Sequence, residues 1–380
     1  MLKRQRYNKM ISIIGAGPAG NHLAYLLSDR GFEVQVFEEH SVIGKPVQCT
    51  GILSEEIRKI IRIEKDFVTN KIRTARIFSS NNSSVEIRLK ENIIINRERF
   101  DDALAEKAMD SGANFYLNSK FEGLSMNEKG YSMRIKSRKN NKTSTKIFRT
   151  DCLVGADGPL SSVAKHAGIF GKRRFFTGLQ IVCKYRNDNV VNFLLMKKGI
   201  GWIVPENEYV ARIGVAVEQD AKQNLNEFLQ KIFGNDYKKI VSKKIEMNAG
   251  LIPIFNPMLR IQKDNIFLLG DAATQVKAST LGGIIPGLKA AELLTESLSR
   301  KKNYAWQCIK NLYPDLVASL ISRRIIDKCS NKEMNLLMKI LKEDKIKKIL
   351  LNNNRDEMSA LAIKAVMNEP RLLYFLIKGL

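Results

Sequence analysis

The sequence predicts an α/β protein in which a parallel sheet is interrupted by an inserted antiparallel sheet and followed by a helical region. Three patterns along the 380 residues support this fold class. Strand and helix signals alternate through the first third, which is typical of a parallel sheet. Strand signals dominate from about Phe175 to Ile254, which is typical of an antiparallel sheet. Helical periodicity then continues from Gly282 almost to the end of the chain.

The first strand leads directly into a glycine-rich turn. The apolar run Met10–Ile14 is followed by Gly-Ala-Gly-Pro-Ala-Gly at Gly15–Gly20, and a helix is expected over Pro18–Ser28. Such glycines allow a tight turn and a close backbone approach to a pyrophosphate, which binds at the free N–H groups of the helix start. A second strand, Glu33–Phe37, ends at Glu38, where a carboxylate can accept hydrogen bonds from ribose hydroxyls. We therefore predict the adenosine end of a dinucleotide site, and not NADP, because Glu38 would repel a 2′-phosphate.

Two later segments complete the predicted site. A short apolar strand ends in Asp157-Gly158, and a further strand ends in Gly270-Asp271. A carboxylate such as Asp271 at the end of a strand suits the hydroxyls of a ribityl chain. The Gly282-Gly283 turn exposes N–H groups at the start of a long helix, where they can face a flavin ring or a pyrophosphate. The three segments together predict FAD.

The order of these segments predicts a discontinuous nucleotide domain whose sheet is begun at the N-terminus, interrupted and completed late. The inserted sheet is expected to bind substrate. The expected boundaries are residues 1–70, 92–170 and 260–300 for the FAD-binding domain, 71–91 and 171–259 for the substrate-binding sheet, and 301–380 for the helical C-terminal region. The polar stretch Arg138–Lys146 is expected to form the tip of a hairpin between Tyr131–Ile135 and Ile147–Phe148.

Composition and charge exclude several classes of protein. The five cysteines are far apart without a C-x-x-C pair, and only three histidines occur, so we expect neither a disulfide scaffold nor a metal site. No apolar run reaches about 18 residues, the length of a membrane span. We expect a cytoplasmic protein that starts near Met1, because the N-terminal sequence lacks the apolar core of a signal peptide. The net charge of +24 fits a solvated lysine-rich surface without a nucleic-acid signature, and attraction to an anionic membrane surface stays open.

In this order and spacing, the three segments resemble the glutathione-reductase-type FAD-binding Rossmann fold of the aromatic-hydroxylase class. The resemblance implies that Glu38 binds the ribose and Asp271 the ribityl or phosphate part. It also implies that Arg97 binds the phosphate region, with Arg99 as the alternative if the register is shifted. The cofactor-binding residues that we expect are Gly15, Gly17, Ala19, Gly20, Glu38, Glu39, Lys45, Pro46, Arg97, Asp157, Gly270, Asp271, Gly282, Gly283 and Ile284.

The loop after Glu38 narrows the resemblance. Residues Gly44–Gly51 contain a Pro-x-x-Cys-x-Gly pattern that resembles the geranylgeranyl reductase family. The segments Asp271–Lys277 and Gly201–Gly214 are similar to two further motifs of that family, and the resemblance spans most of residues 10–300. The sequence departs from the family where aromatic residues, a third glycine and a proline are usual, at Ile200, Val204, Leu281 and Ala278.

The resemblance implies a flavin-dependent reductase that saturates double bonds of geranylgeranyl chains, with archaeal-type membrane glycerophospholipids as the expected substrates. Cys49 is expected to assist proton delivery or to position substrate, and Trp202 to stabilise developing positive charge through its π face. Core packing is the alternative for both residues. The expected substrate-binding residues are Trp202, Pro205 and Gly214. The implied partners are an isoprenoid lipid and an external electron donor, which is ferredoxin, a reduced deazaflavin or NADPH.

Two other functions stay open from the sequence. One is a flavin monooxygenase of the same fold that acts on an aromatic compound, which the Cys49 loop disfavours. The other is a membrane-associated flavin electron carrier without alkene chemistry. The tail Arg300–Leu380 mixes basic and apolar residues at helical spacing, which is typical of a helix that packs on the protein and also of one that lies on an anionic membrane. A peripheral position at the inner membrane face is therefore an alternative to a purely cytoplasmic one.

Overall fold

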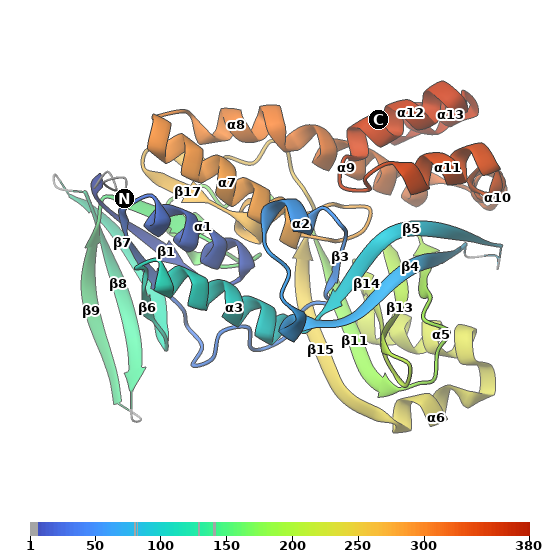
Figure 1. The fold of residues 1–380 in the computed structure, drawn as a ribbon, viewed down its shortest axis with the longest axis horizontal. Helices are drawn as coiled ribbons and strands as arrows, with labels where there is room; N and C mark the ends of the chain where they lie inside the picture. The colour runs from blue at the N-terminus through green and yellow to red at the C-terminus, as the bar shows by residue number, and fades with distance from the viewer. Residues whose placement is uncertain (1–6, 80, 82, 128–129, 140–141) are drawn as a thin grey trace.

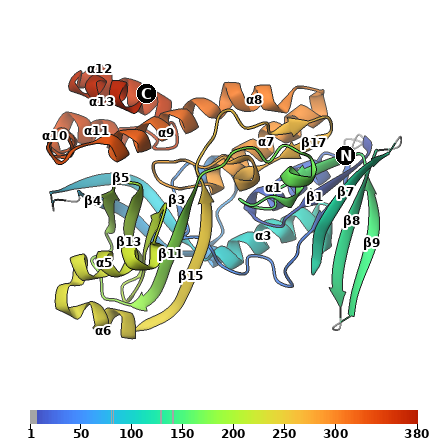
Figure 2. The same ribbon diagram turned by 180° about the vertical axis from the view of Figure 1, so that it is seen from behind.

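The structure is a computed structural model that describes residues 7–79, 81, 83–127, 130–139 and 142–380. The expected start of the chain at residues 1–6 lies outside this description. The described residues form a six-stranded, an eight-stranded and a three-stranded sheet. The three-stranded sheet lies at one end of an elongated molecule and the eight-stranded sheet at the other, with the six-stranded sheet between them (Figure 1). The C-terminal helices lie over the eight-stranded sheet in both views (Figures 1 and 2).

The six-stranded sheet has the predicted nucleotide-binding topology. Its order is β16-β17-β10-β1-β2-β6, and every neighbouring pair is parallel except the edge pair of β16 with β17. Its first strands come from the N-terminus and its last from beyond residue 260, so the sheet is begun early and completed late, as the sequence predicts. The strands are β1 Tyr7–Ile14, β2 Phe32–Phe37, β6 Asn114–Tyr116, β10 Cys152–Gly155, β16 Gln262–Lys263 and β17 Ile266–Leu268.

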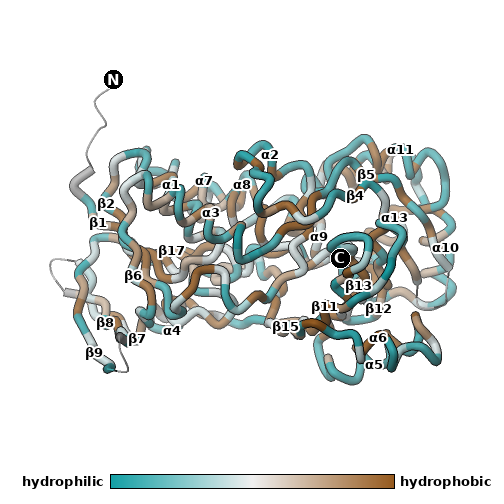
Figure 3. Tube along the Cα trace, turned by 60° about the horizontal axis from the view of Figure 1, so that its bottom comes forward, coloured by the Kyte–Doolittle hydropathy of each residue, from teal (hydrophilic) through white to brown (hydrophobic). Residues whose placement is uncertain are grey.

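Helices α1, α3 and α7 pack side by side along this sheet (Figure 1). Small residues allow the close approach. The Cβ of Ala19 on α1 would lie 3.3 Å from a Cβ added at Gly270 and 3.2 Å from one added at Gly287. Figure 3 shows hydrophobic residues along the strands of the molecule's interior and hydrophilic ones on its outer turns. The helices and turns of this part are α1 Pro18–Asp29, α3 Arg97–Asp110, α4 Ser162–His166, the 3-10 turn η3 Gly270–Ala273, α7 Ile284–Arg300 and α8 Tyr304–Asn311.

The three-stranded sheet contains the predicted hairpin but corrects its length. Strand β8 (Gly130–Lys139) pairs with β7 (Ser119–Asn127) on one side and with β9 (Lys142–Thr150) on the other. The pairing of β8 with β9 continues to Lys139 and Lys142, so most of the expected tip Arg138–Lys146 is strand. Exposed polar residues are compatible with a strand that faces solvent, which is why composition alone placed a loop there. Residues 140–141 lie outside the described residues.

The eight-stranded sheet joins two separate parts of the chain. Its order is β15-β11-β14-β13-β12-β4-β5-β3, and the pairs are antiparallel except β12 with β4. That parallel pair is where the earlier strands meet the later ones, and the expectation of a wholly antiparallel sheet is wrong there. β4 begins before residue 71 and β5 ends beyond residue 91. The strands are β3 Ile52–Leu53, β4 Val68–Phe78, β5 Ser84–Ile95, β11 Phe175–Lys184, β12 Val191–Met196, β13 Gly199–Asn207, β14 Val210–Val217 and β15 Lys244–Pro253.

Two helices, α5 and α6 (Tyr237–Ser242), cover one face of this sheet, although the sequence shows few helix signals there. α5 (Ala221–Phe233) turns Leu225, Phe228 and Leu229 toward the sheet, at the spacing of a helix face. A Cβ added at Gly201 would lie 2.8 Å from the Phe228 ring, so α5 covers the face of β13 to which Gly201 belongs. The remaining short elements between residues 57 and 242 are α2 Ile57–Ile60, the 3-10 turns η1 Lys65–Phe67 and η2 Gly234–Asp236, and α6 Tyr237–Ser242.

The C-terminal region is helical, as predicted, and packs on the eight-stranded sheet. α10 and α11 contact β5, and α9 contacts β12. No helix in the described part of the chain is long and apolar enough to cross a membrane. The helices are α9 Tyr313–Lys328, α10 Asn331–Lys342, α11 Asp344–Asn352, α12 Met358–Asn368 and α13 Arg371–Gly379.

Candidate active site

The first glycine-rich turn is shaped by close backbone contacts on two sides and is open on a third. Gly15 has φ of +104°, and a Cβ there would lie 2.4 Å from the carbonyl oxygen of Ala156. A Cβ at Gly20 would lie 2.1 Å from the carbonyl oxygen of Gly15. By contrast, a Cβ at Gly17 meets no atom within 4 Å. The fold therefore requires glycine at Gly15 and Gly20 but not at Gly17, and the open side of Gly17 suits the pyrophosphate of a dinucleotide.

Glu38 lies at the end of β2 beside this turn. Its Oε2 accepts a hydrogen bond from the backbone N–H of Ala16 at 2.8 Å, and its Oε1 accepts one from the N–H of His40 at 2.9 Å. These bonds fix the carboxylate beside the glycine turn. The neighbouring Glu39 points elsewhere, since its exposed carboxylate pairs with Lys120 at 2.8 Å. The structure therefore brings Glu38, but not the Glu39 carboxylate, to the glycine turn.

Asp157 organises the turn of the second segment, which lies against the glycine turn of the first. Its Oδ1 accepts a hydrogen bond from the Ser161 hydroxyl at 2.6 Å, and its Oδ2 accepts one from the N–H of Val163 at 3.0 Å. Burial raises the pKa of Asp157, and these hydrogen bonds oppose the rise. Its Cα would lie 3.1 Å from a Cβ at Gly15. The carboxylate thus holds the start of α4 in place, a local role that the sequence analysis did not foresee.

Asp271 and the Gly282-Gly283 turn meet at the start of α7. A Cβ at Gly283 would lie 2.8 Å from Oδ1 of Asp271, so only glycine allows this approach. Burial raises the pKa of Asp271 to about 6, and the nearby Arg97 opposes the rise. Among the hydrogen bonds of the described residues, none satisfies the Asp271 carboxylate. A half-buried acceptor without a protein donor fits the hydroxyls of a ribityl chain.

Arg97, rather than Arg99, faces this site. Its Nε and Nη2 donate to the Asp101 carboxylate at 3.1 and 2.8 Å, and the Cys49 thiol lies near its guanidinium. Burial alone would lower the pKa of Arg97, but Asp101 and Cys49 hold it above its ordinary value. Arg99 is exposed and donates to the carbonyl oxygen of Asp66. Arg97, and not the alternative Arg99, therefore lies near Asp271.

The Cys49 loop is anchored to the eight-stranded sheet by two buried polar residues. Gln180 on β11 accepts a hydrogen bond from the Thr50 hydroxyl at 3.0 Å and donates to the Cys49 carbonyl oxygen at 3.4 Å. Arg212 on β14 donates to the Thr50 carbonyl oxygen at 2.6 Å. Gly51, with φ of +75°, makes room for this arginine, because a Cβ there would lie 2.8 Å from Nη1 of Arg212.

The start of the same loop lies on α3. Lys45 pairs with Glu98 at 3.0 Å and is followed by Pro46. A Cβ at Gly44 would lie 2.7 Å from the Cα of Glu98, so the loop and the helix are in close contact. The loop therefore bridges the helix that carries Arg97 and the sheet that carries Gln180.

Trp202 shares Gln180 with the Cys49 loop. Its Nε1 donates to the Gln180 Oε1 at 3.2 Å, and its side chain is only 8% exposed. Gly214 allows the indole ring to lie flat on β14, since a Cβ there would be 2.6 Å from the ring atom Cζ2. Pro205 is three residues further along β13, and side chains alternate along a strand, so it lies on the opposite face from Trp202. The structure brings Cys49, Trp202 and Gly214 together but does not bring Pro205 to them.

Gln180 and Arg212 were missed by the sequence analysis, although a signal for both exists. Each is a polar residue at an alternate position of an otherwise apolar strand, on the face that carries Trp202. A polar side chain on the buried face of a strand needs a specific partner, and here that partner is the Cys49 loop.

An apolar cluster fills the Trp202 face of the sheet and extends to the Gly282 turn. It contains Trp202 and three of the four residues at which the sequence departs from the geranylgeranyl reductase family, and the fourth, Leu281, packs against it. The cluster residues are Ile72, Ile94, Phe176, Val191, Ile200, Trp202, Val204, Ala216, Ile254, Ala278 and Leu320, with Ile52, Phe193, Ile252 and Leu281 packed against it.

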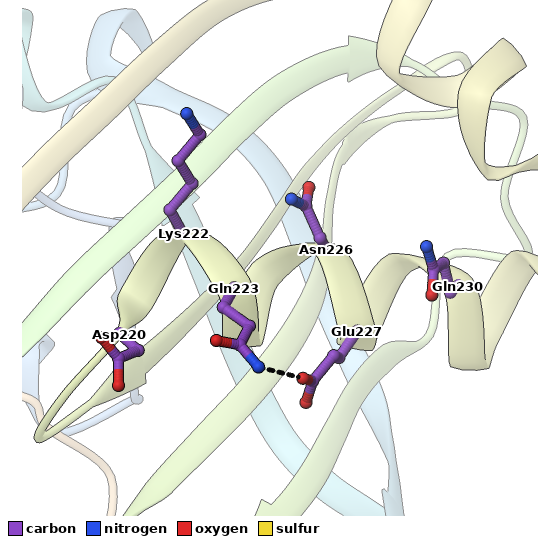
Figure 4. A pocket seen from close by; sticks show the side chains of 6 residues that line it. All are labelled: Asp220, Lys222, Gln223, Asn226, Glu227 and Gln230. Atoms are coloured by element: carbon purple, nitrogen blue, oxygen red, sulfur yellow. Dashed lines mark hydrogen bonds between the residues drawn. The ribbon is translucent and has the colours of Figure 1, made fainter.

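Two surface hollows of about 500 Å³ lie elsewhere. One lies on the outer side of α5 and is lined only by polar side chains (Figure 4). The other lies between α5 and the outer face of the sheet, next to Phe228 and Ile203. Both are on the α5 side of the eight-stranded sheet, whereas Trp202, Gln180 and the Cys49 loop lie on its other face. We therefore place the candidate site at the Trp202 face. The six side chains of the first hollow are those of Asp220, Lys222, Gln223, Asn226, Glu227 and Gln230.

The chain belongs to the family of proteins with an FAD binding domain, whose model matches residues 9–284. The glycine turns, Glu38 and the unsatisfied Asp271 fit this cofactor, so the chain is an FAD-dependent oxidoreductase with FAD as its cofactor.

More particular similarities exist. The chain is 25% identical over 395 aligned positions to the digeranylgeranylglycerophospholipid reductase of Methanococcus vannielii, with 96% of each protein covered. It is 29% identical over 339 positions to digeranylgeranylglycerophospholipid reductase 3 of Methanosphaera stadtmanae, with 83% of each covered. Its fold is similar to the crystal structure of a geranylgeranyl bacteriochlorophyll reductase-like protein from Thermoplasma acidophilum, with a TM-score of 0.82, 19% identity and coverage of 98% and 100%. The predicted resemblance to the geranylgeranyl reductase family is confirmed.

Replacement of Gly17 by Ala tests the glycine turn. Because the added Cβ meets no protein atom, we expect the thermal unfolding temperature of the apoprotein to be unchanged. The affinity for FAD should fall at least about tenfold, since the methyl group occupies the side open to the pyrophosphate. Gly20→Ala is the matched control and should lower the unfolding temperature, because its Cβ would clash with the Gly15 carbonyl. Wild-type FAD affinity in the Gly17→Ala protein would contradict the assignment.

Proposed function

We propose that this chain reduces carbon–carbon double bonds of geranylgeranyl chains, with archaeal-type membrane glycerophospholipids as substrates. The observation that carries the proposal is the anchored Cys49 loop, which lies between the Arg97–Asp271 part of the cofactor site and the Trp202 face of the sheet. The names of the two methanogen relatives support the same substrate class. An isoprenoid chain is apolar along its whole length, and the cluster around Trp202 is the apolar surface next to the loop.

The protein residues would bind and orient the chain and exclude water. Reduction adds a hydride and a proton across the double bond, and bound reduced FAD supplies the hydride while it becomes oxidised. Ile200, Trp202 and Val204 point to one face of β13, and Leu281 from the Gly282 turn packs against their cluster. Such a surface would hold an isoprenoid chain flat and dry between the sheet and the turn. The Trp202 ring would face any positive charge that develops on carbon.

Cys49 would position the substrate or deliver the proton. Its Sγ accepts a hydrogen bond from the N–H of Gly51 at 3.3 Å, and the thiol lies near the guanidinium of Arg97. Its carbonyl oxygen accepts the bond from Gln180. Cys49 is partly exposed, whereas the other four cysteines are buried. A partly exposed thiol near a guanidinium fits a chemical role better than packing.

An external donor would reduce the flavin again. The sequence contains a single strong glycine fingerprint, at Gly15–Gly20, and we assign it to FAD. Ferredoxin, a reduced deazaflavin and transiently bound NADPH are the donors to be compared, by following bleaching of the flavin absorbance under anaerobic conditions.

A single-turnover assay tests the reductase against its two rivals. Dithionite-reduced protein with FAD is incubated without oxygen with a geranylgeranylated glycerophospholipid, and the lipid is analysed by mass spectrometry. We expect a gain of two hydrogen atoms per double bond together with reoxidation of the flavin. The oxidised protein is the control. An unchanged lipid beside a flavin that stays reduced would favour an electron carrier. Oxygen consumption and hydroxylation of an added aromatic compound would favour a monooxygenase.

Replacement of Cys49 by Ser separates a chemical role from a packing role. We expect the FAD affinity to stay within about twofold of wild type and the single-turnover rate to fall about 100-fold, the usual scale for loss of a proton-transfer group. Cys183→Ala is the control, because Cys183 lies in the cluster on the α5 face of the sheet and should leave the rate unchanged. A Cys49→Ser protein with wild-type turnover would end the catalytic assignment.

We also propose that the last two helices attach the protein to an anionic membrane surface. Ile363 and Met367 on α12, and Leu373, Ile377 and Leu380 at the end of the chain, are each more than half exposed. Exposed apolar residues four apart on short helices, in a protein with a net charge of +24, are typical of helices that lie at a membrane surface. The proposed lipid substrate would be reached there.

Vesicle co-sedimentation tests the membrane proposal. Replacement of Ile363, Met367, Leu373 and Ile377 by Gln should lower the fraction bound to vesicles with anionic lipids about tenfold, because buried apolar area is lost without a change of charge. A control with Met258→Gln and Ile147→Gln removes exposed apolar residues elsewhere and should bind as wild type does. Equal binding by both variants would contradict the proposal, as would binding that persists in vesicles without anionic lipids.

A further inference from the structure

A loop of the C-terminal region reaches into the candidate site. Residues 353–357 connect α11 and α12. The amide of Asn354 donates to the carboxylate of Glu56, and the carboxylate of Asp356 accepts hydrogen bonds from the Ser54 hydroxyl and from Nζ of Lys277. Asn354, Asp356, Ser54 and Lys277 are all buried. The loop is thus fixed on both sides of the residue at its centre.

That central residue, Arg355, has no hydrogen-bond or ion-pair partner among the residues that the structure describes. Its side chain is half-buried, and its Nε is fully buried without a hydrogen bond. Within the described part of the chain, no carboxylate pairs with its guanidinium. The nearest acid in sequence, Asp356, is committed to Lys277 and Ser54. Glu56 is committed to Asn354, to Lys289 at 2.7 Å and to a second lysine.

Other largely buried arginines have protein acceptors, and half-buried Arg173 donates to three carbonyl oxygens. Arg97 has the Asp101 carboxylate, Arg212 has two carbonyl oxygens and Glu206, and Arg323 has two carbonyl oxygens and Asp327. Burial lowers the pKa of Arg355, and Asp356 only partly opposes this. A guanidinium that has lost part of its water without gaining a carboxylate destabilises the protein, and its amino groups remain free for an anion from outside.

The surroundings of Arg355 indicate what the anion belongs to. Lys277 lies against the Gly282 turn, since a Cβ at Gly282 would be 3.4 Å from its Cε. The residue after Lys277 is Ala278, a member of the apolar cluster, and Ile52, two residues before Ser54, packs against the same cluster. The loop therefore holds Arg355 at the border between the apolar cluster and a group of lysines. A ligand that is apolar along its length and carries a phosphoryl oxyanion at one end fits this border.

We propose that Arg355 binds the phosphate group of the isoprenoid lipid and so sets which end of the chain enters the site. This proposal rests on the proposed function for the identity of the lipid, but the anion site itself does not. A guanidinium binds two phosphate oxygens at once, which fixes the orientation of the headgroup. With the headgroup held at Arg355, the isoprenoid chain extends along the cluster toward Trp202.

Three probes and three substitutions test the proposal. The FAD-loaded protein is titrated with geranylgeranyl diphosphate, with geranylgeraniol and with inorganic pyrophosphate, and binding is measured by calorimetry. Arg355→Gln should weaken the binding of geranylgeranyl diphosphate about 10- to 100-fold and leave that of geranylgeraniol within about twofold. Arg355→Lys should recover part of the loss, because it keeps the charge without the fork geometry. Lys348→Gln, which removes an exposed charge on α11, is the matched control and should bind all three probes as wild type does.

The stability of the variant separates binding from a structural role. Because Arg355 has no protein partner to lose, the unfolding temperature of Arg355→Gln should equal or exceed that of wild type. A fall of the unfolding temperature with equal weakening of both lipid probes would overturn the proposal. So would inorganic pyrophosphate that binds as tightly as geranylgeranyl diphosphate, since the site would then serve a free phosphate.

The test is independent of the reduction assay. Failure of the wild-type protein to reduce either geranylgeranyl diphosphate or geranylgeraniol would contradict the proposed function. Weaker binding of geranylgeranyl diphosphate to Arg355→Gln would still support the anion site in that case. Reduction of geranylgeranyl diphosphate and geranylgeraniol by Arg355→Gln, each with the wild-type KM, would overturn the anion site but not the proposed function.

Discussion

Arg212 joins the two halves of the candidate site. Its Nη1 donates to the carbonyl oxygens of Thr50 at 2.6 Å and of Ile95 at 3.0 Å, and its Nε donates to Glu206 at 3.1 Å. Thr50 follows Cys49, and Ile95 lies two residues before Arg97. One buried guanidinium therefore fixes the distance between the thiol and the arginine that faces the cofactor. Burial of that charge is costly unless its donors are satisfied, so the loop conformation and the fold of the sheet depend on each other.

The C-terminal helices contribute more than a cover for the sheet. The buried pair of Lys277 with Asp356 fastens them to the turn that precedes α7, the helix whose start meets Asp271. Burial lowers the pKa of Lys277, whereas Asp356 raises it, and the Lys277 ammonium holds the pKa of Asp356 at about 2. Removal of either partner would leave a buried charge alone, which is strongly destabilising. Asp356, which follows Lys277 by 79 positions in the sequence, thus holds the Gly282 turn.

The sequence alone predicted the parts of the site that depend on local spacing. The turn at Gly15–Gly20, the carboxylate of Glu38 and the late strand before Asp271 follow from rules that relate neighbouring residues. The parts that it missed are contacts between distant segments. Gln180 and Arg212 meet the Cys49 loop across more than 100 residues, and their roles appear only when the register of β11, β13 and β14 is known. The same register moves Pro205 away from Trp202, because a single position along a strand changes the face.

The four departures from the geranylgeranyl reductase family gain a common explanation from their position. Ile200 and Val204 flank Trp202 on one face of β13, and Ala278 and Leu281 belong to the turn that packs against that face. Changes at facing positions of one packed cluster are coupled, since the volume lost on one side has to be filled from the other. Aliphatic side chains beside Trp202 present a smooth apolar surface without the edges of stacked rings, and Leu281 from the turn adds to it. The departures therefore change the shape of the surface along which the proposed isoprenoid chain would lie, while the anchors of that surface, Gln180 and Arg212, are left in place.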